Sequence, residues 1–335
     1  MDMELKDKLI SQLDSRYFPP KGSKLLVAVS GGVDSTILLY MLVLLAAKWD
    51  WEIIVAHFNH QLRKSAGRDA RFVAEIASSL GLKFVLGSRD VAKMAKAKKL
   101  TIEEAGRTAR YHWLQTVAKR YKATRVVTAH TADDQVETVV MNWLRGGLVR
   151  ALAGMRMREG DLWRPFLHIP KIELQKFAKH YYIQFREDTS NKDLIYTRNL
   201  VRHKILPMLK KASPGIEGVI LRNAGSWTQL EDWLNHYLDD IYKKVSLRGQ
   251  KDEIRFNETR FRELDGFVQN ELLLLAIQKL KGDRQDINKV HLDEMQAVVS
   301  SPQSMSWKQL PGKLFLGKGY GRISVSRHRP KFVDK

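Results

Sequence analysis

The residues best suited to chemistry form a hexapeptide at residues 30–35, Ser-Gly-Gly-Val-Asp-Ser, which follows an apolar run at residues 25–29. The apolar run is typical of a buried strand, and the residues after the hexapeptide continue as a helix. Two glycines allow a ligand to approach the backbone closely, and the N–H groups at a helix start point toward an anion. The two serines add hydroxyl donors. The pattern therefore predicts a phosphate-binding loop.

Asp34 sets this loop apart from the two common phosphate loops. Neither Gly-x-x-x-x-Gly-Lys nor Gly-x-Gly-x-x-Gly is present, and no lysine follows the glycines. A carboxylate beside phosphates is repulsive unless a divalent cation lies between them. We therefore expect Asp34 to act through such a cation, with no lysine nearby. An ordinary strand–glycine–helix turn with a capping serine is the alternative.

A second cluster lies at residues 130–138, where three acids begin an expected helix. Asp134 and Glu137 are three residues apart and share one helical face, and Asp133 lies beside them. Three acids exceed what the helix dipole needs. Paired carboxylates can hold a metal, or receive an ammonium group and deprotonate it. The alternative is a capping pair of Thr131 and Asp134, with a solvated Glu137.

Two pairs of arginines also share helical faces. Arg107 and Arg110 are three residues apart, and Arg198 and Arg202 are four apart. Guanidinium groups suit phosphate or a developing negative charge. The alternatives are pairing with neighbouring glutamates for the first two arginines and an ordinary basic helix for the second two.

The elements that must position these clusters alternate along the first half of the chain. Four apolar runs are each followed by a helical pattern, at residues 25–29, 51–58, 83–86 and 125–130. Such alternation predicts an α/β fold with a parallel, doubly wound sheet, in which ligands gather beyond the carboxyl ends of the strands. The phosphate loop and two further segments lie there, and these segments add the candidates His57, Asn59, His60, Arg63, His130 and Asp133.

The best candidate for a domain boundary is the turn-forming segment Ser213-Pro214-Gly215. Helices are expected beyond it, at residues 216–245, 270–280 and 286–299. The alternating stretch at 307–326, with its glycine turns, indicates a small β unit. We expect a catalytic domain with a helical extension at residues 1–213, and a mainly helical C-terminal domain ending in β structure at 214–335.

Composition narrows the class of protein. The 335 residues carry a net charge of +20, which favours a polyanionic partner, nucleic acid first, over a merely solubilising surface charge. The chain has no cysteine, which excludes disulfides, zinc–thiolate sites and iron–sulfur clusters. No apolar run has the length of a membrane span and the N-terminus lacks a signal pattern, so we expect a cytoplasmic protein without a membrane partner.

Taken in order, the motifs resemble those of a known family. The hexapeptide looks like the pyrophosphate loop of the ATP-pyrophosphatase, or PP-loop, superfamily, whose fold is adenine nucleotide alpha hydrolase-like. His-Phe-Asn-His-Gln-Leu-Arg, Glu-Ala-x-Arg-x-x-Arg-Tyr, His-Thr-Ala-Asp-Asp-Gln-x-Glu-Thr and Asp-x-Ser-Asn…Arg-Asn-x-x-Arg follow it. Together they resemble the tRNA(Ile)-lysidine synthase family over residues 24–210. Leu148 and Ala151 depart from it, because glycines are common at these two positions.

The resemblance implies a reaction and a set of roles. Enzymes of this family use ATP and Mg²⁺ to attach L-lysine to C2 of the wobble cytidine in tRNA(Ile) with a CAU anticodon, through an adenylated cytidine. It implies that the C-terminal domain binds the tRNA, and it adds a homodimer as a candidate assembly. By resemblance, the ATP-binding residues are Ser30, Gly31, Gly32, Val33, Asp34 and Ser35, and the catalytic residues are Asp34 as the Mg²⁺ ligand, Asp134 and Glu137 for lysine, and Arg110 and Arg202.

Two alternatives of different classes stay open. One is an ATP-dependent enzyme that acts on a small molecule, similar to a GMP or NAD synthetase. The charge of +20 and the Asp-Asp-Gln-x-Glu-Thr segment argue against it. The other is a tRNA-binding module without activity, and the intact Ser30, Asp34 and Ser35 argue against that.

Overall fold

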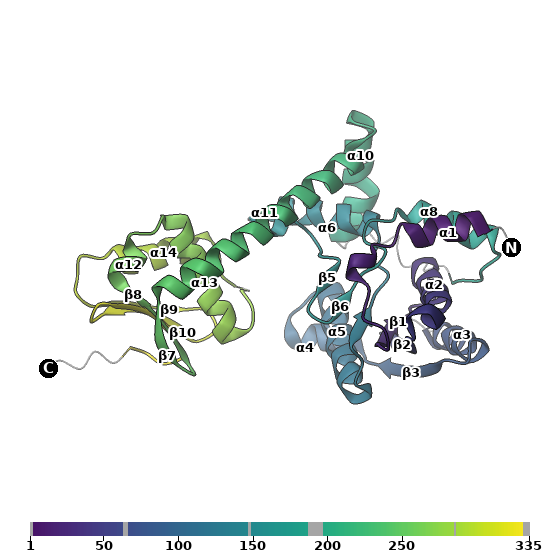
Figure 1. The fold of residues 1–335 in the computed structure, drawn as a ribbon, viewed down its shortest axis with the longest axis horizontal. Coiled ribbons are helices and arrows are strands. Elements are labelled where there is room, and N and C mark those ends of the chain that lie inside the picture. Colours follow the sequence, from purple (N-terminus) through teal and green to yellow (C-terminus); the bar gives the residue numbers. More distant parts are fainter. Residues whose placement is uncertain (1–2, 63–65, 147–148, 187–196, 285, 331–335) are drawn as a thin grey trace. The chain divides into compact units, whose positions relative to one another are not determined.

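The structure, a computed structural model, describes residues 3–62, 66–146, 149–186, 197–284 and 286–330 (Figure 1). The chain forms two compact units, Met1–Thr228 and Gln229–Lys335. Helix α11 (Ile216–Val245) begins in the first unit and ends in the second. Each unit has its own hydrophobic core.

A six-stranded sheet with the order β3-β2-β1-β4-β6-β5 organises the first unit. All neighbours are parallel except the last pair, β6 and β5. The strands are β1 (Lys24–Ala28), β2 (Glu52–Asn59), β3 (Lys83–Ser88), β4 (Arg125–Val127), β5 (Arg158–Glu159) and β6 (Leu162–Trp163). Because β2 and β4 flank β1, the chain reverses its direction of winding between β1 and β4, where ligands bind in such sheets.

Successive side chains of β1 enter opposite faces of the sheet, and both faces are buried. Leu25 and Val27 belong to one hydrophobic cluster, with residues of α2, α3 and α8, whereas Leu26 packs against α5 on the other side. This two-sided burial explains why the strand reads as a continuous apolar run. The helices are α1 (Met3–Ser11), α2 (Val33–Trp49), α3 (Ala66–Ser79), α4 (Val91–Lys98), α5 (Ile102–Tyr121), α6 (Ala132–Leu144), α7 (Val149–Leu152) and α8 (Lys171–His180). The predicted doubly wound α/β fold is confirmed.

A separate helical cluster lies beyond the carboxyl ends of the strands. Val136 and Val140 of α6 pack against Val201 and Leu206, which lie in a continuous run of α9 (Thr197–Leu200), a π-helical turn (Val201–Ile205) and α10 (Leu206–Ala212). The first turns of α11 complete the cluster. The arginines at 198 and 202 are thereby held next to α6.

The structure adds detail that the sequence patterns did not predict. The strand expected at residues 125–130 ends at Val127, and the short strands β5 and β6 extend the sheet beyond β4. Two residues are too short a stretch to show any periodicity.

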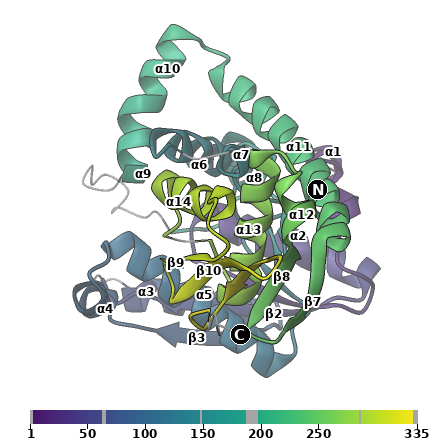
Figure 2. The ribbon, with the colours of Figure 1, turned by 90° about the vertical axis from the view of Figure 1, so that its left-hand side faces the viewer.

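The second unit contains a five-stranded antiparallel sheet with the order β7-β8-β11-β10-β9 (Figure 2). The expected β unit at its end is present as three strands, and the hairpin of β7 and β8 joins them. Its elements are β7 (Ser246–Gln250), β8 (Glu253–Asn257), α12 (Glu258–Arg262), α13 (Gly266–Lys281), α14 (Lys289–Ser300), β9 (Ser306–Leu310), β10 (Leu314–Gly319) and β11 (Arg322–Ser326). None of the described helices in either unit is long and apolar enough to cross a membrane.

Candidate active site

The loop after β1 has the geometry of an anion site. Gly31 has φ +93°, a conformation that favours glycine, and it lets the chain turn tightly between β1 and α2. The hydroxyls of Ser30 and Ser35 lie 3.0 Å apart, and the Ser30 N–H donates to the Ser35 hydroxyl at 3.1 Å. Gly32 is the N-cap of α2 and no side chain caps this helix start. The N–H groups of the first turn are thus left for a ligand.

Asp34 points from this loop toward the start of α8. Its Oδ2 lies 3.3 Å from Nζ of Lys171, so the expectation that no lysine lies near Asp34 is wrong. Its Oδ1 is buried and has no hydrogen-bond partner among the described residues. Burial raises the pKa of Asp34 and outweighs the opposing effect of Lys171. The carboxylate is held ready for a further cationic partner.

The alternative interpretation of the acids at the start of α6 is correct for the capping pair and wrong for Glu137. Thr131 and Asp134 form a capping box, because the Thr131 N–H donates to Asp134 Oδ2 at 2.9 Å and the Asp134 N–H donates back to the threonine hydroxyl. The Asp133 carboxylate accepts a hydrogen bond from the backbone N–H of Lys171 at 2.7 Å, which joins α6 to α8. Glu137, in contrast, is not a solvated residue: it is 2% exposed.

Glu137 and Asp134 hold the two arginines from the neighbouring helix. Arg198 donates from Nε to Glu137 at 2.8 Å and from Nη2 to Asp134 Oδ1 at 3.1 Å. Arg202 donates to both oxygens of Glu137, at 2.5 and 2.9 Å. Burial by itself would lower the pKa of each arginine, but the two carboxylates raise both values. The sequence predicted all four residues as candidates, but not that they form one ionic cluster.

Arg110 and His130 lie near enough to this cluster for its charges to act on both. The guanidinium carbons of Arg110 and Arg107 lie 5.2 and 4.9 Å from the centre of the Tyr111 ring. Burial lowers the pKa of Arg110, and its Nε has no hydrogen-bond partner among the described residues. His130 bonds through Nδ1 to the Thr128 hydroxyl at 2.9 Å, and burial lowers its pKa to about 3. The imidazole is therefore neutral at physiological pH.

None of the described candidates at the end of β2 lines the pocket around Asp34, and one of them, His57, supports the loop. His57 is buried and bonds through Nδ1 to the carbonyl of Val29 at 2.8 Å, which joins β2 to the residue before the loop. Burial lowers the pKa of His57. Asn59 accepts a hydrogen bond from the backbone of Gln61. His60 lies against Gly106 of α5, where an added Cβ would come within 3.1 Å of the ring.

Some of the expected features lie outside the described residues. Arg63, Leu148 and the Asp-x-Ser-Asn segment at residues 188–191 belong to this group. Ala151, the second position that departs from the family, lies in α7, and its carbonyl accepts a hydrogen bond from the Asn142 amide at 2.6 Å.

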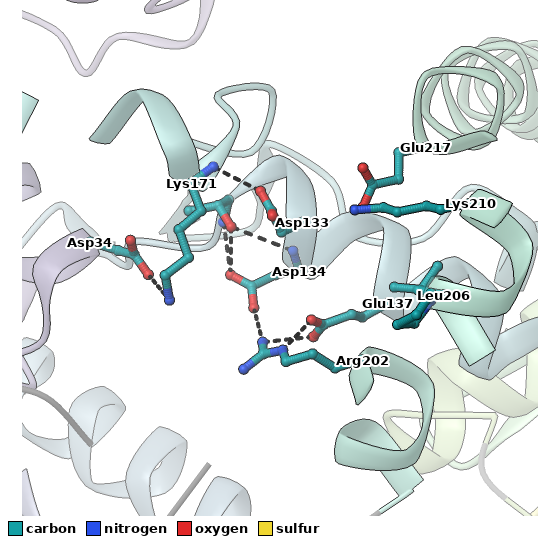
Figure 3. Close-up of a pocket in the computed structure, with 11 residues that line it drawn as sticks. Asp34, Asp133, Asp134, Glu137, Lys171, Arg202, Leu206, Lys210 and Glu217 are labelled. Carbon is teal, nitrogen blue, oxygen red and sulfur yellow. Dashed lines mark hydrogen bonds and ion pairs between the residues drawn. The ribbon is translucent and has the colours of Figure 1, made fainter. Parts of the chain in front are cut away.

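The acids, Lys171 and Arg202 line one pocket of about 280 Å³ (Figure 3). It is lined by Asp34, Thr131, Asp133, Asp134, Glu137, Lys171, Arg202, Leu206, Pro207, Lys210 and Glu217. Sequence reasoning missed Lys171 and the ion pair of Lys210 and Glu217, whose charged atoms lie 2.7 Å apart. The only local signal for Lys171 was its place after Pro170, which marks a helix start but not a site.

The pocket fits one mode of magnesium binding. Among the described residues, no group of three or more His, Asp or Glu side chains is placed to hold a metal ion. Mg²⁺ is usually held by one or two carboxylates together with substrate phosphates and water, so it does not need such a group. The unpartnered Oδ1 of Asp34, next to the phosphate loop, suits that mode.

Comparison with known proteins places the chain among PP-loop proteins. Residues 5–209 match the PP-loop domain. A tRNA(Ile)-lysidine synthase from Geobacter sulfurreducens is 32% identical over 331 residues, which cover 98% of this chain and 70% of that protein. Another from Thermosipho africanus is 35% identical over 255 residues, which cover 75% of this chain and 60% of that protein. The chain thus spans less than the full length of these relatives.

A solved structure agrees with the fold. The U34-tRNA thiolase NcsA from Methanococcus maripaludis superimposes with a TM-score of 0.54 at 20% sequence identity, covering 67% of this chain and 77% of that chain. At this identity the likeness concerns the fold alone. It supports the fold described above for the first unit.

Proposed function

Because this chain belongs to the tRNA(Ile)-lysidine synthase family of PP-loop proteins, we propose that it joins L-lysine to C2 of the wobble cytidine in tRNA(Ile) with a CAU anticodon, at the expense of ATP. One observation carries the proposal. Asp34 of the phosphate loop and the acids of α6 line the same pocket, so a nucleotide and an amine can meet there.

The first step activates a poor electrophile. The O2 atom of cytosine attacks the α-phosphorus of ATP, the O2–P bond forms, and the bond from that phosphorus to pyrophosphate breaks. We assign binding of the phosphates to residues 30–35, through backbone N–H groups and hydroxyls, and stabilisation of the negative charge to Arg110. Asp34 would hold Mg²⁺, which supplies positive charge beside the phosphates when it is bound.

The second step needs a neutral amine. The ε-amine of lysine attacks C2, AMP leaves with the former O2 atom, and the amine loses a proton. This amine is protonated near neutral pH, with a pKa of about 10.4 in water, so it needs a carboxylate partner. Asp134 is the better candidate, because its side chain is 20% exposed against 3% for Glu137. We assign Glu137 to holding Arg198 and Arg202 beside that site.

Binding of tRNA(Ile) would account for the net charge of +20. The anticodon loop must deliver an unstacked cytidine into the pocket, as single-stranded bases are usually recognised. A net charge of +20 favours binding of the tRNA backbone, and we assign residues 214–335 to this task as well. A homodimer and a place in the cytoplasm stay predictions.

Release of pyrophosphate tests the proposal. The purified protein, ATP and Mg²⁺ should release pyrophosphate only when tRNA(Ile) with the CAU anticodon is present. Without lysine, we expect adenylated tRNA to accumulate, and added lysine should consume it. The methionine tRNA with the same anticodon is the control and should give little release. Release without any tRNA, with a small nucleotide as the acceptor, would instead favour an enzyme similar to a GMP or NAD synthetase.

A further inference from the structure

Lys171 is a pocket residue that the proposed roles leave unused. It is the first residue of α8, directly after the N-cap Pro170. Its backbone N–H is fixed by the carboxylate of Asp133, and its ammonium group reaches across the pocket to Asp34 (Figure 3). The base of the side chain is thus anchored, while its charged end lies between α8 and the phosphate loop. We propose that Lys171 binds the pyrophosphate part of ATP and stabilises it as it leaves.

The position of this lysine is unfavourable for the helix that carries it. The N-terminus of a helix is its positive end, where anions stabilise and cations destabilise. Three helices, α2, α6 and α8, begin around the pocket, with their first turns near Asp34, Asp134 and Lys171. A lysine at such a point adds positive charge to an anion site. Helix stability therefore does not explain Lys171, whereas a polyanionic ligand does.

The partner of Lys171 is one that ATP binding would occupy. Asp34 contacts the ammonium group through Oδ2, and its Oδ1 has no partner among the described residues. When a divalent cation and phosphates enter, Asp34 gains the cation. Lys171, whose side chain is 35% exposed, gains the phosphates. The pair thus exchanges one ion pair for two, and no charge is left without a partner.

The contact of Lys171 with the phosphates matters for the first chemical step. This part of the inference rests on the proposed function. As the O2–P bond forms, the bond to pyrophosphate breaks and its electron pair leaves with the pyrophosphate oxygen. An ammonium group near that oxygen stabilises the charge that develops there, and it need not lose its proton. The phosphate loop itself contains no cationic side chain, so Lys171 supplies what the loop lacks.

Binding of inorganic pyrophosphate with Mg²⁺, measured by calorimetry without tRNA, tests this role directly. We expect Lys171→Gln to weaken pyrophosphate binding by about ten- to a hundredfold, because one charge-assisted contact is lost. AMP binding should not change. Lys171→Arg should retain most of the affinity. Lys176→Gln is the matched control, since Lys176 lies on the same helix in an ion pair with Glu173 and outside the pocket.

The outcomes separate this inference from the proposed function. Equal pyrophosphate affinity in the wild type and in Lys171→Gln, with a normal melting temperature, would overturn the role of Lys171. An equal loss of AMP and pyrophosphate binding would point to a distorted pocket and would also overturn it. A selective loss of pyrophosphate binding supports the role, even if the wild-type protein releases no pyrophosphate with tRNA(Ile), a result that would contradict only the proposed function.

Discussion

Asp34 shows how a single residue can serve a reaction at the expense of stability. Burial raises its pKa above the usual value for a carboxyl group. A carboxyl whose pKa is raised by folding stabilises the fold when it is protonated, and this stabilisation is lost as the pH rises through the raised pKa. Near neutral pH, the ionised Asp34 is therefore a destabilising group that the site retains for its ligand.

We predict that Asp34→Asn abolishes pyrophosphate release and raises the melting temperature at pH 7. A gain of about 1 kcal/mol would correspond to roughly 2–4 °C for a unit of this size. Thermal melts at several pH values check the sign, because the gain should shrink as the pH falls through the raised pKa of Asp34 and the wild-type carboxyl becomes protonated as well. A lower melting temperature at pH 7, or an active variant, would contradict this view of Asp34.

Asp134 allows the two half-reactions to be separated. We predict that Asp134→Asn raises the KM for lysine by about tenfold to a hundredfold, since it removes one charge opposite an ammonium group. Pyrophosphate release should be retained, because the phosphate loop does not need this carboxylate. Single-turnover assays that follow the adenylate and the final product separately would measure both. If the variant lost adenylation and kept its lysine dependence, the carboxylate would belong to the first step.

Glu137→Gln tests the binding of lysine less directly than Asp134→Asn does. Glu137 is buried and accepts hydrogen bonds from Arg198 and Arg202, so its replacement leaves two arginines facing one carboxylate instead of two. We expect a raised KM for lysine together with a lower melting temperature. Glu173→Gln, in the exposed ion pair with Lys176, is the control and should change neither. An unchanged Glu137→Gln variant would show that the contacts of Glu137 with the two arginines matter neither for lysine binding nor for stability.

At the scale of elements, a glutamine fastens α6 to the chain that follows it. The Gln135 amide donates to the carbonyls of Ala153 and Met155, at 3.0 and 3.1 Å, and accepts the Met155 N–H at 2.7 Å. Gly154 lies between these contacts with φ +69°, and an added Cβ would lie 2.7 Å from the glutamine oxygen. Gln135 lies next to Asp134, so this contact also helps to set the start of α6.

We therefore predict that Gly154→Ala destabilises the first unit by about 1–3 kcal/mol, through backbone strain and the steric contact. Thermal or urea unfolding measures this loss. The control is Gly225→Ala in α11, where nothing lies within 4 Å of an added Cβ and φ is not positive. There we expect a gain of up to about 1 kcal/mol, because alanine favours a helix over glycine. Similar effects of the two substitutions would show that the Gln135 contact has little weight.

Whether the sequence predicted a feature of these elements depends on how far apart in the chain the residues that form it lie. The capping box at Thr131, which was the alternative interpretation, and the shared face of Asp134 and Glu137 are both local patterns, and both are present. The pairing of Arg198 with Asp134 joins residues 64 apart, and no periodicity reports it. Lys171 likewise reaches Asp34 only because α8 packs against α2, which carries Asp34. The strand β6 is too short for any pattern to reveal it.

At the scale of the whole molecule, the net charge of +20 makes a prediction about salt. Binding of tRNA should weaken steeply with ionic strength, because each phosphate contact releases counterions. With about six contacts, we expect a loss on the order of a thousandfold between 50 and 200 mM salt by the rule for duplex DNA, and less for RNA. Titrations of labelled tRNA at several salt concentrations give the slope. A flat response would mean that the charge serves solubility.

In the proposed reaction, one pocket activates a cytidine and then receives lysine. The most direct test is to incubate a tRNA(Ile) transcript carrying the CAU anticodon with the protein, ATP, Mg²⁺ and labelled lysine, and to analyse its nucleosides by mass spectrometry. We predict a cytidine in which lysine has replaced the oxygen at C2, at the wobble position only, and none when ATP is omitted. Hydrolysis of ATP that depends on this tRNA, but leaves its wobble cytidine unmodified in the presence of lysine, would contradict this prediction.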